Sequence, residues 1–167
     1  ASDAIALRAA AYSGLRLPTL NELYRPFVVF PVVTEANAAL ENERLEGVEV
    51  GVDLTPTDGV AISLTAFDNR VKNAIANVTI GTNLRQRRNI DAIHARGVEL
   101  SASATFGRFD AIASAAWTDA ESQGSGFAAA LDGNRPSQTP RFVGETTLSY
   151  RPAENWVFSM SLRHVGA

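Results

Sequence analysis

The sequence predicts an all-β fold of antiparallel up-and-down strands, about seven in number, that form a partial segment of a transmembrane β-barrel. Apolar and polar residues alternate along stretches of about nine residues, close to the length with which a tilted strand crosses a bilayer. The connections are short at one end of these strands and long at the other, which is typical of barrels in membranes. No apolar run approaches the roughly 18 residues of a membrane helix, so a helical membrane protein is excluded.

The alternation is clearest between residues 47 and 106, where each predicted strand has one apolar face. The apolar sets are Val48, Val50, Val52 and Leu54; Val60, Ile62, Leu64 and Ala66; and Val98, Leu100, Ala102, Ala104 and Phe106. A soluble sandwich has the same period, so alternation alone leaves both architectures open. The segregation of short and long connections favours the barrel. Short turns are predicted at 55–59, 106–108 and 151–155, and long polar links at about 14–43, 76–88 and 120–139.

The strands are predicted, in chain order, at 4–13, 44–54, 60–75, 88–105, 109–119, 141–150 and 156–165. The first ends before Pro18, which has no backbone donor for a sheet. Thr19 and Glu22 then stand at capping-box spacing, which predicts one short helical turn. Trp117 and Trp156 fall near strand ends with outward parity, as expected of aromatic girdles at the two membrane interfaces.

The composition and motifs give no indication of catalysis or of nucleic-acid binding. The 167 residues suffice for one domain, and 15 basic residues against 18 acidic ones give no basic surface. The absence of cysteine fits an oxidising compartment without demanding one. The two histidines lie far apart, and no H-E-x-x-H, G-x-S-x-G or phosphate-binding glycine loop is present. We therefore expect no enzyme, no catalytic or metal site, and no cofactor.

Four segments resemble one family in order and spacing. The segment SGLRLPTLNELY at residues 13–24 is similar to the S-G-F-R-x-P-T-L-x-E-L-Y motif in the barrel of TonB-dependent outer-membrane receptors. Residues 37–53, 67–75 and 88–99 resemble three further motifs of that family. Ala38 and Asn42 depart from the pattern, because the family usually carries proline there.

The resemblance implies a 22-stranded barrel, of which seven strands are about a third of the wall. An open set of strands leaves unpaired edges that cannot persist in lipid, so the chain is expected to be a fragment, residues 1–167, without the plug domain and the barrel ends. The implied location is the bacterial outer membrane. The implied function is active import of a scarce solute, such as a ferric siderophore, cobalamin or a glycan. The implied partners are the TonB complex acting through the missing plug, outer-membrane lipid and lipopolysaccharide, and a small-molecule ligand.

The register of the hairpin formed by strands 60–75 and 88–105 follows if the hairpin is level at its inner end. The expected pairs are Val60 with Ala104, Asp68 with Arg96, and Arg70 with His94. The charged residues, together with Lys72, have two interpretations. One is a basic patch for lipopolysaccharide phosphates; the favoured one is cross-strand charge pairing on a wet wall, worth about 0.2–1 kcal/mol.

The candidate ligand-binding residues lie in the predicted external loops, where basic side chains would attract an anionic ligand. They are Arg16, Tyr24, Arg85, Arg87 and Arg88. The alternative for the densest basic run, residues 85–88, is a solvated loop. The apolar run 27–33 is expected to pack against a neighbouring loop or the plug rather than to contact ligand. A further set of charged residues is expected to line the lumen: Arg8, Glu49, Asp53, Glu99, Glu145 and Arg163.

Two other classes of protein share the strand pattern. One is a soluble, secreted antiparallel β-sandwich that binds glycans or protein, and the other is a passive porin-type barrel. The segregated turns argue against the sandwich. The four family-like segments argue against the porin.

Overall fold

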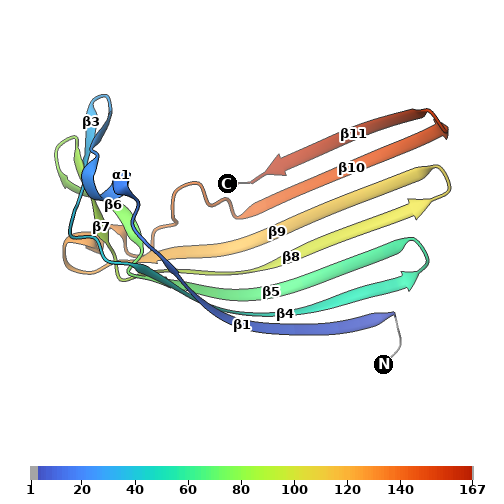
Figure 1. Cartoon of the computed structure of the whole chain (residues 1–167), viewed down its shortest axis with the longest axis horizontal. Helices are drawn as coiled ribbons and strands as arrows, with labels where there is room; N and C mark the ends of the chain where they lie inside the picture. The colour runs from blue at the N-terminus through green and yellow to red at the C-terminus, as the bar shows by residue number, and fades with distance from the viewer. Residues whose placement is uncertain (1–3, 167) are drawn as a thin grey trace.

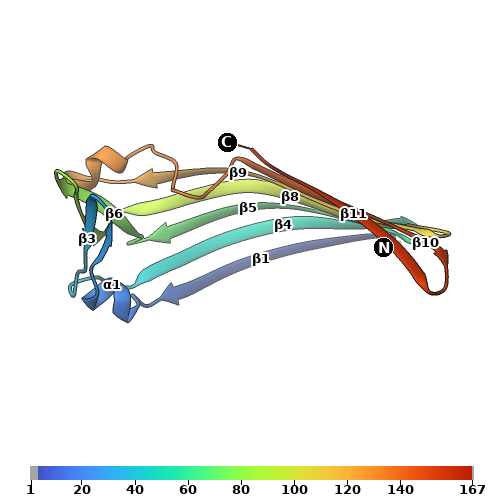
Figure 2. The same cartoon turned by 90° about the horizontal axis from the view of Figure 1, so that it is seen from above.

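The computed structural model describes residues 4–166, and seven long strands form one antiparallel sheet (Figure 1). In the order of the sheet they are β1 (Ile5–Arg16), β4 (Glu43–Thr57), β5 (Val60–Lys72), β8 (Ala92–Phe106), β9 (Phe109–Gln123), β10 (Phe142–Ala153) and β11 (Trp156–Val165). The sheet is curved and twisted (Figure 2), and β1 and β11 are its two open edges among the described residues. The predicted up-and-down strands of a partial barrel are therefore confirmed.

The strand ends at the loop side differ from the prediction in both directions. The predicted strands 60–75 and 88–105 are too long there, because β5 ends at Lys72 and β8 begins at Ala92, while β1 and β9 extend further than predicted. The sequence predicts a first strand at 4–13, whereas β1 runs to Arg16, which lies opposite Glu43 of β4. β9 likewise reaches Gln123, opposite Ala92 of β8. Backbone pairing does not require an apolar side chain, so the ladders continue beyond the membrane band.

The predicted register between β5 and β8 is confirmed. The pairs are Val60 with Ala104, Asp68 with Arg96, and Arg70 with His94. Across the β5–β8 pair the side chains bond diagonally, with His94 Nε2 2.9 Å from Asp68 Oδ1. Arg96 Nη2 instead lies 3.4 Å from Oδ2 of Asp119, its directly opposite neighbour on β9. Adjacent strands of a twisted sheet are rotated, so long side chains reach diagonal neighbours. Charge pairing is thus present on this wall, and the partner of Asp68 is the diagonal His94 rather than the opposite Arg96.

The outward face of the sheet is apolar and uncovered. Leu7 is 83% exposed, Met160 70% and Leu162 72%. A continuous apolar surface of this kind is unfavourable in water and matches the lipid-facing band of a membrane barrel. Among residues 4–166, no helix has the length and apolar character needed to span a membrane.

Aromatic side chains border this apolar band at both ends, as predicted. Near the short turns, Phe109 stacks on Tyr150 with ring centroids 4.7 Å apart, and Trp156 lies at the start of β11. Toward the loops, Trp117 of β9 lies opposite Phe142 of β10. At about 3.3 Å per residue, Phe109 and Trp117 are about 26 Å apart along the strand, comparable to the apolar height of an outer-membrane barrel.

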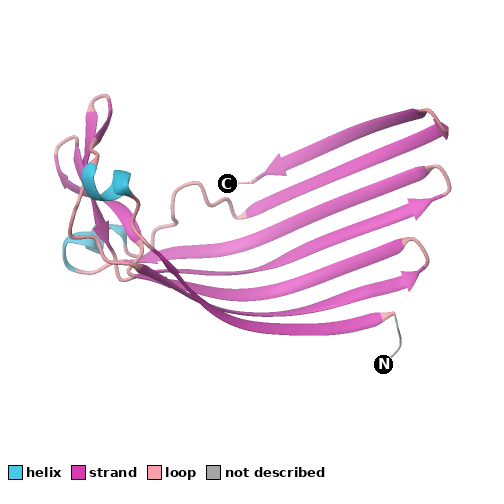
Figure 3. Ribbon diagram, viewed as in Figure 1, coloured by secondary structure: helices cyan, strands magenta, loops and turns pink. Residues whose placement is uncertain are grey.

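The external loops fold into a second sheet, which the sequence pattern does not predict. Its order is β2 (Phe27–Val29), β3 (Val32–Glu35), β7 (Leu84–Asn89) and β6 (Ile75–Gly81), with β3 and β7 parallel. Both helical segments, α1 (Leu20–Tyr24) and the 3-10 turn at Gly126–Leu131, also lie at this end (Figure 3). The pairing of β3 with β7 agrees with the expectation that the apolar run 27–33 packs against a neighbouring loop, although Phe30 remains 93% exposed.

A small apolar core joins two of the external loops. Ala74, Val78, Ile90 and Ala128 are buried, and Leu131 packs against them. These residues come from two segments: the link between β5 and β8, which contains β6, and the loop after β9. The loops are therefore a folded unit rather than solvated connections.

Candidate ligand-binding loops and luminal wall

The first loop begins with the predicted capping box. Thr19 Oγ1 accepts a hydrogen bond from the Glu22 backbone N–H at 3.2 Å, and Glu22 Oε2 accepts one from the Thr19 N–H at 2.7 Å. These reciprocal bonds satisfy donors that the first turn of a helix leaves free. α1 is therefore fixed at the external end of β1.

Arg16 joins this helix to the wall. Its Nη1 lies 3.0 Å from Glu22 Oε2, and its Nε donates to Glu43 Oε2. Glu43 is buried and also accepts a hydrogen bond from the Ile75 N–H at 2.6 Å. Arg16, a candidate ligand residue, is thus already engaged in a network that connects α1, β1, β4 and β6.

The same network shifts the pKa values of its members. Hydrogen bonds to Glu43 and then to Glu22 raise the pKa of Arg16 above its ordinary value. Burial alone would raise the pKa of Glu22, but hydrogen bonds from Arg16 and Thr19 outweigh it and lower that pKa from 4.5 to about 2. Both side chains are therefore charged at neutral pH.

A pH dependence follows from the depressed pKa of Glu22. Its stabilising contribution is fully present above pH 4.5 and is lost as the pH falls toward about 2. We expect pepsin to cleave α1 at Leu23 or Tyr24 faster at pH 2 than at pH 4, relative to a denatured substrate. A Glu22→Ala variant should lose most of this difference between the two pH values. If the cleavage rate of the wild-type protein, relative to that of the denatured substrate, did not change with pH, the assignment to Glu22 would be contradicted.

Arg87 and Arg88 also support the loops. Arg87 Nη1 donates to the carbonyl oxygens of Asn21 at 2.7 Å and Arg25 at 2.9 Å, and its guanidinium lies 4.9 Å from the Phe27 ring centroid. It therefore connects β7 to the C-terminal end of α1, where cations are favourable.

Arg88 makes a similar contact with the loop after β9. Its Nε donates to Gln86 Oε1 at 2.8 Å, and its guanidinium lies 4.4 Å from the ring centroid of Phe127 in the loop after β9. Cation–π contacts of this kind stabilise by about 0.5–1 kcal/mol at exposed sites. Arg88 is thus partly engaged and only half-buried.

Two of the five candidates remain available. Arg85 is exposed and Tyr24 is 66% exposed, and neither side chain has a polar partner within residues 4–166. Arg25 is likewise exposed and its guanidinium unpaired in that part of the chain, although sequence reasoning omitted it. Its position directly after the SGLRLPTLNELY segment could have identified Arg25 as a candidate ligand residue. The external surface therefore presents Tyr24, Arg25 and Arg85.

The inward face of the sheet is polar, as the residue parity predicts. The charged luminal residues predicted from sequence all have inward parity in the observed register. Arg8 is the most connected of them: it donates to Asp53 Oδ2 at 3.2 Å and to Ser63 Oγ at 3.0 Å, and it also bonds Thr65. Its Nη1 lies 3.9 Å from Glu49 Oε1.

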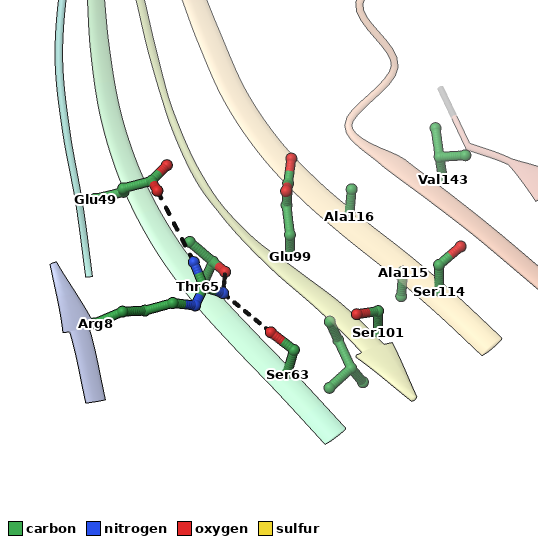
Figure 4. Close-up of a pocket in the computed structure, with 11 residues that line it drawn as sticks. Arg8, Glu49, Ser63, Thr65, Glu99, Ser101, Ser114, Ala115, Ala116 and Val143 are labelled. Atoms are coloured by element: carbon green, nitrogen blue, oxygen red, sulfur yellow. Dashed lines mark hydrogen bonds and ion pairs between the residues drawn. The ribbon is translucent and has the colours of Figure 1, made fainter. Parts of the chain in front are cut away.

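A recess of about 420 Å³ opens beside Arg8 on this inward face (Figure 4). Arg8, Glu49 and Thr65 line one side of it, and Glu99 projects from β8. The other lining residues are mostly alanine and serine: Ser63, Ser101, Ser114, Ala115 and Ala116, with Leu100 and Val143. Among residues 4–166, no three His, Asp or Glu side chains are grouped so that they could hold a metal ion.

Comparison with known proteins identifies the architecture. A family model described as TonB dependent receptor-like, beta-barrel, matches residues 1–167. No curated protein sequence matches the chain. Similar solved structures include the copper transporter OprC, at 20% identity and a TM-score of 0.73, over 99% of this chain and 24% of that one. The siderophore receptor PirA from Pseudomonas aeruginosa has 16% identity and a TM-score of 0.72, over 99% of this chain and 28% of that one.

The FrpB iron transporter from Neisseria meningitidis is similar too, at 19% identity and a TM-score of 0.64, over 96% of this chain and 24% of its own. The chain thus spans about a quarter of the length of these structures. At such identities the structural likeness shows the fold, whereas the family match covers the whole chain. The chain belongs to the TonB-dependent receptor family, as part of its β-barrel.

Proposed function

We propose that this chain is a fragment of the wall of an outer-membrane receptor that imports a scarce solute with energy from the TonB complex. The family consists of outer-membrane receptors and transporters rather than enzymes. The observation that carries the proposal is the combination of a seven-stranded wall, apolar outside and polar inside, with external loops that fold into a unit of their own. Such a wall separates solute from lipid while the loops provide a fixed surface for capture.

The exposed side chains of the loops favour an anionic solute. Arg25 and Arg85 have no carboxylate partner within the described residues, and Tyr24, next to Arg25 in the sequence, offers an aromatic face. The similar structures named above include receptors or transporters of copper, siderophore and iron. A ferric siderophore suits this surface best; cobalamin and glycans are the other candidates.

The proposed partners follow from the same architecture. A plug inside the lumen would transmit the pull of the TonB complex. Outer-membrane lipid would contact the apolar band, and lipopolysaccharide would surround its outer end. On that end Lys72 Nζ is 2.6 Å from Glu46 Oε2 and Arg96 pairs with Asp119, whereas Arg70 donates to the neutral Gln123 Oε1 at 2.9 Å.

The alternative of a soluble sandwich is disfavoured because no second sheet covers the outward apolar face within residues 4–166. A passive porin-type barrel is disfavoured by the family match over the whole chain.

The first test uses the full-length receptor in isolated outer membranes, applied to a denaturing gel with and without boiling. A closed barrel resists detergent, so we expect its mobility to change on boiling. Binding would then be screened with ferric chelates, cobalamin and oligosaccharides. Recovery of the protein in the soluble fraction with no mobility change would overturn the receptor assignment.

A second prediction concerns Arg85. Replacing Arg85 by alanine should weaken binding of an anionic ferric chelate about ten-fold, because an exposed unpaired guanidinium is lost without loss of a structural contact. Arg108→Ala, in the short turn between β8 and β9, is the matched control and should bind as wild type. Equal affinities of the two variants in a titration would exclude Arg85 from the binding surface.

A further inference from the structure

β7 is the strand at which the three external loops meet. The first loop is 17–42, the second, which contains β7, is 73–91, and the third is 124–141. β7 pairs with β3 of the first loop on one side and with β6 on the other. Within residues 4–166, no hydrogen bond, ion pair or ring contact joins the first loop directly to the third. Any influence of the third loop on the first therefore passes through the second.

Two adjacent arginines of β7 contact the two other loops. Consecutive side chains of a strand point to opposite faces of the sheet. Arg87 Nη1 donates to the carbonyl oxygens of Asn21 at 2.7 Å and Arg25 at 2.9 Å, at the C-terminal end of α1. On the opposite face, the guanidinium of Arg88 lies 4.4 Å from the ring centroid of Phe127 in the 3-10 turn. Figure 2 shows α1 and this turn, in orange, on either side of the external sheet.

The third loop has internal contacts that fix the 3-10 turn. The Gly124 N–H donates to Asp132 Oδ1 at 3.1 Å, which joins the two ends of the turn. Ala128, next to Phe127, belongs to the buried apolar core that also contains Ile90, the residue directly after β7. Phe127 therefore presents its ring to β7 from a fixed support.

The first loop, in contrast, depends on polar contacts for the position of α1. None of the residues of α1 is buried, and the helix is held by Arg16 at its start and by Arg87 at its end. A displacement of β7 would move Arg87 and, with it, the end of α1. β7 therefore determines the position of all three residues of the capture surface, Tyr24, Arg25 and Arg85.

We propose that Phe127 and Arg88 are positioning residues for this capture surface, although they lie on the opposite face of the external sheet. The inference rests on the proposed function, in which the surface binds an anionic solute. The ring of Phe127 restrains Arg88 and thereby β7, so that Arg87 keeps its bonds to α1. Local opening occurs in cooperative units, so loss of the contact on one face of β7 releases the loop on the other face.

Amide hydrogen exchange in the full-length receptor without ligand tests this coupling. The Leu23 and Arg25 N–H groups donate to the carbonyl oxygens of Thr19 and Asn21 at 3.0 and 3.1 Å, so their exchange reports opening of α1. Phe127→Leu keeps an apolar side chain but removes the aromatic face, and we expect about three-fold faster exchange. Phe127→Tyr keeps the ring and should exchange as wild type. Wild-type exchange in Phe127→Leu would overturn the proposal.

A double-mutant cycle tests whether the two residues act as a pair. Arg88→Gln should accelerate exchange of α1 by a factor similar to that of Phe127→Leu. The double variant should exchange no faster than either single variant, because both changes remove the same contact. Arg108→Gln, in the short turn between β8 and β9, controls for loss of a positive charge and should exchange as wild type. Additive effects of Arg88→Gln and Phe127→Leu would overturn the pairing.

Titration with an anionic ferric chelate then separates the positioning role from the proposed function. We expect Phe127→Leu to bind the chelate about three-fold more weakly than wild type, and Phe127→Tyr to bind it equally well. Wild-type affinity in Phe127→Leu would overturn the positioning role and leave the proposed function intact. A wild-type receptor that bound no anionic chelate would contradict the proposed function, and the exchange rates would still decide whether the third loop restrains α1.

Discussion

Replacing Gly97 by alanine is expected to destabilise the barrel wall more than any other single-methyl change among the long strands. Gly97 is buried on β8, and a Cβ there would lie 2.2 Å from the Trp117 carbonyl oxygen and 2.9 Å from Cζ of Phe67. The oxygen belongs to the backbone of β9, so β8 and β9 must separate to accept the methyl group. Overpacking of this kind costs about 1–3 kcal/mol, and here it also disrupts interstrand hydrogen bonds.

The measurement is the denaturation temperature of the full-length receptor, followed by loss of the compact band on unheated gels. Gly14→Ala is the matched control, because a Cβ at Gly14 on β1 meets nothing within 4 Å. The control should leave the temperature unchanged or raise it slightly, since alanine reduces the entropy of the unfolded chain. If the two variants unfolded at the same temperature, the close approach of β8 and β9 at Gly97 would be disproved.

Replacing Glu43 by alanine is expected to open the external loops while the barrel stays closed. Glu43 has a side chain only 11% exposed and accepts hydrogen bonds from Arg16 and from the Ile75 N–H. Its loss would leave a backbone donor unpaired and would free Arg16, whose side chain is 46% exposed and therefore rehydrates in part. Allowing for that rehydration, we expect a local cost of about 2 kcal/mol, or about a thirty-fold larger open population.

Trypsin treatment of whole cells measures this opening, because the external segment 85–88 contains three arginines. Cleavage there should be faster in Glu43→Ala by a similar factor when opening is rapid relative to cleavage. Glu41→Ala is the matched control: the Glu41 side chain makes one long contact, 3.3 Å from Asn73 Nδ2, and its backbone bonds with Asn89 do not depend on the side chain. Equal cleavage of both variants would show that Glu43 does not hold the loops.

The segment with Ala38 and Asn42 illustrates how the structure compensates for a departure from the family pattern. Asn37 Nδ2 donates to the Arg87 carbonyl at 3.0 Å, and Asn37 Oδ1 accepts from the Ala39 N–H at 3.0 Å. Asn89 Oδ1 accepts from the Glu41 N–H at 2.8 Å. Side-chain amides thus fix a segment in which the usual prolines are missing.

The seven long strands, their order, the β5–β8 register, the luminal and outward faces, and the capping box of α1 could all be predicted from the amino-acid sequence. Alternation has a period of two and the cap joins Thr19 to Glu22, so both depend on residues close together in the chain. The β5–β8 register joins residues far apart in the chain, and its prediction depended on taking the two strands as level at their inner ends, which the pairing of Val60 with Ala104 confirms. The tertiary structure alone decided which arginines are free. Arg16 meets Glu43, and Arg87 meets Asn21, across many residues of chain. The four short external strands also lack the length that makes alternation recognisable, and the parallel pairing of β3 with β7 joins two separate loops. Contacts of this kind form only when loops far apart in the sequence come together, so no local pattern could indicate them.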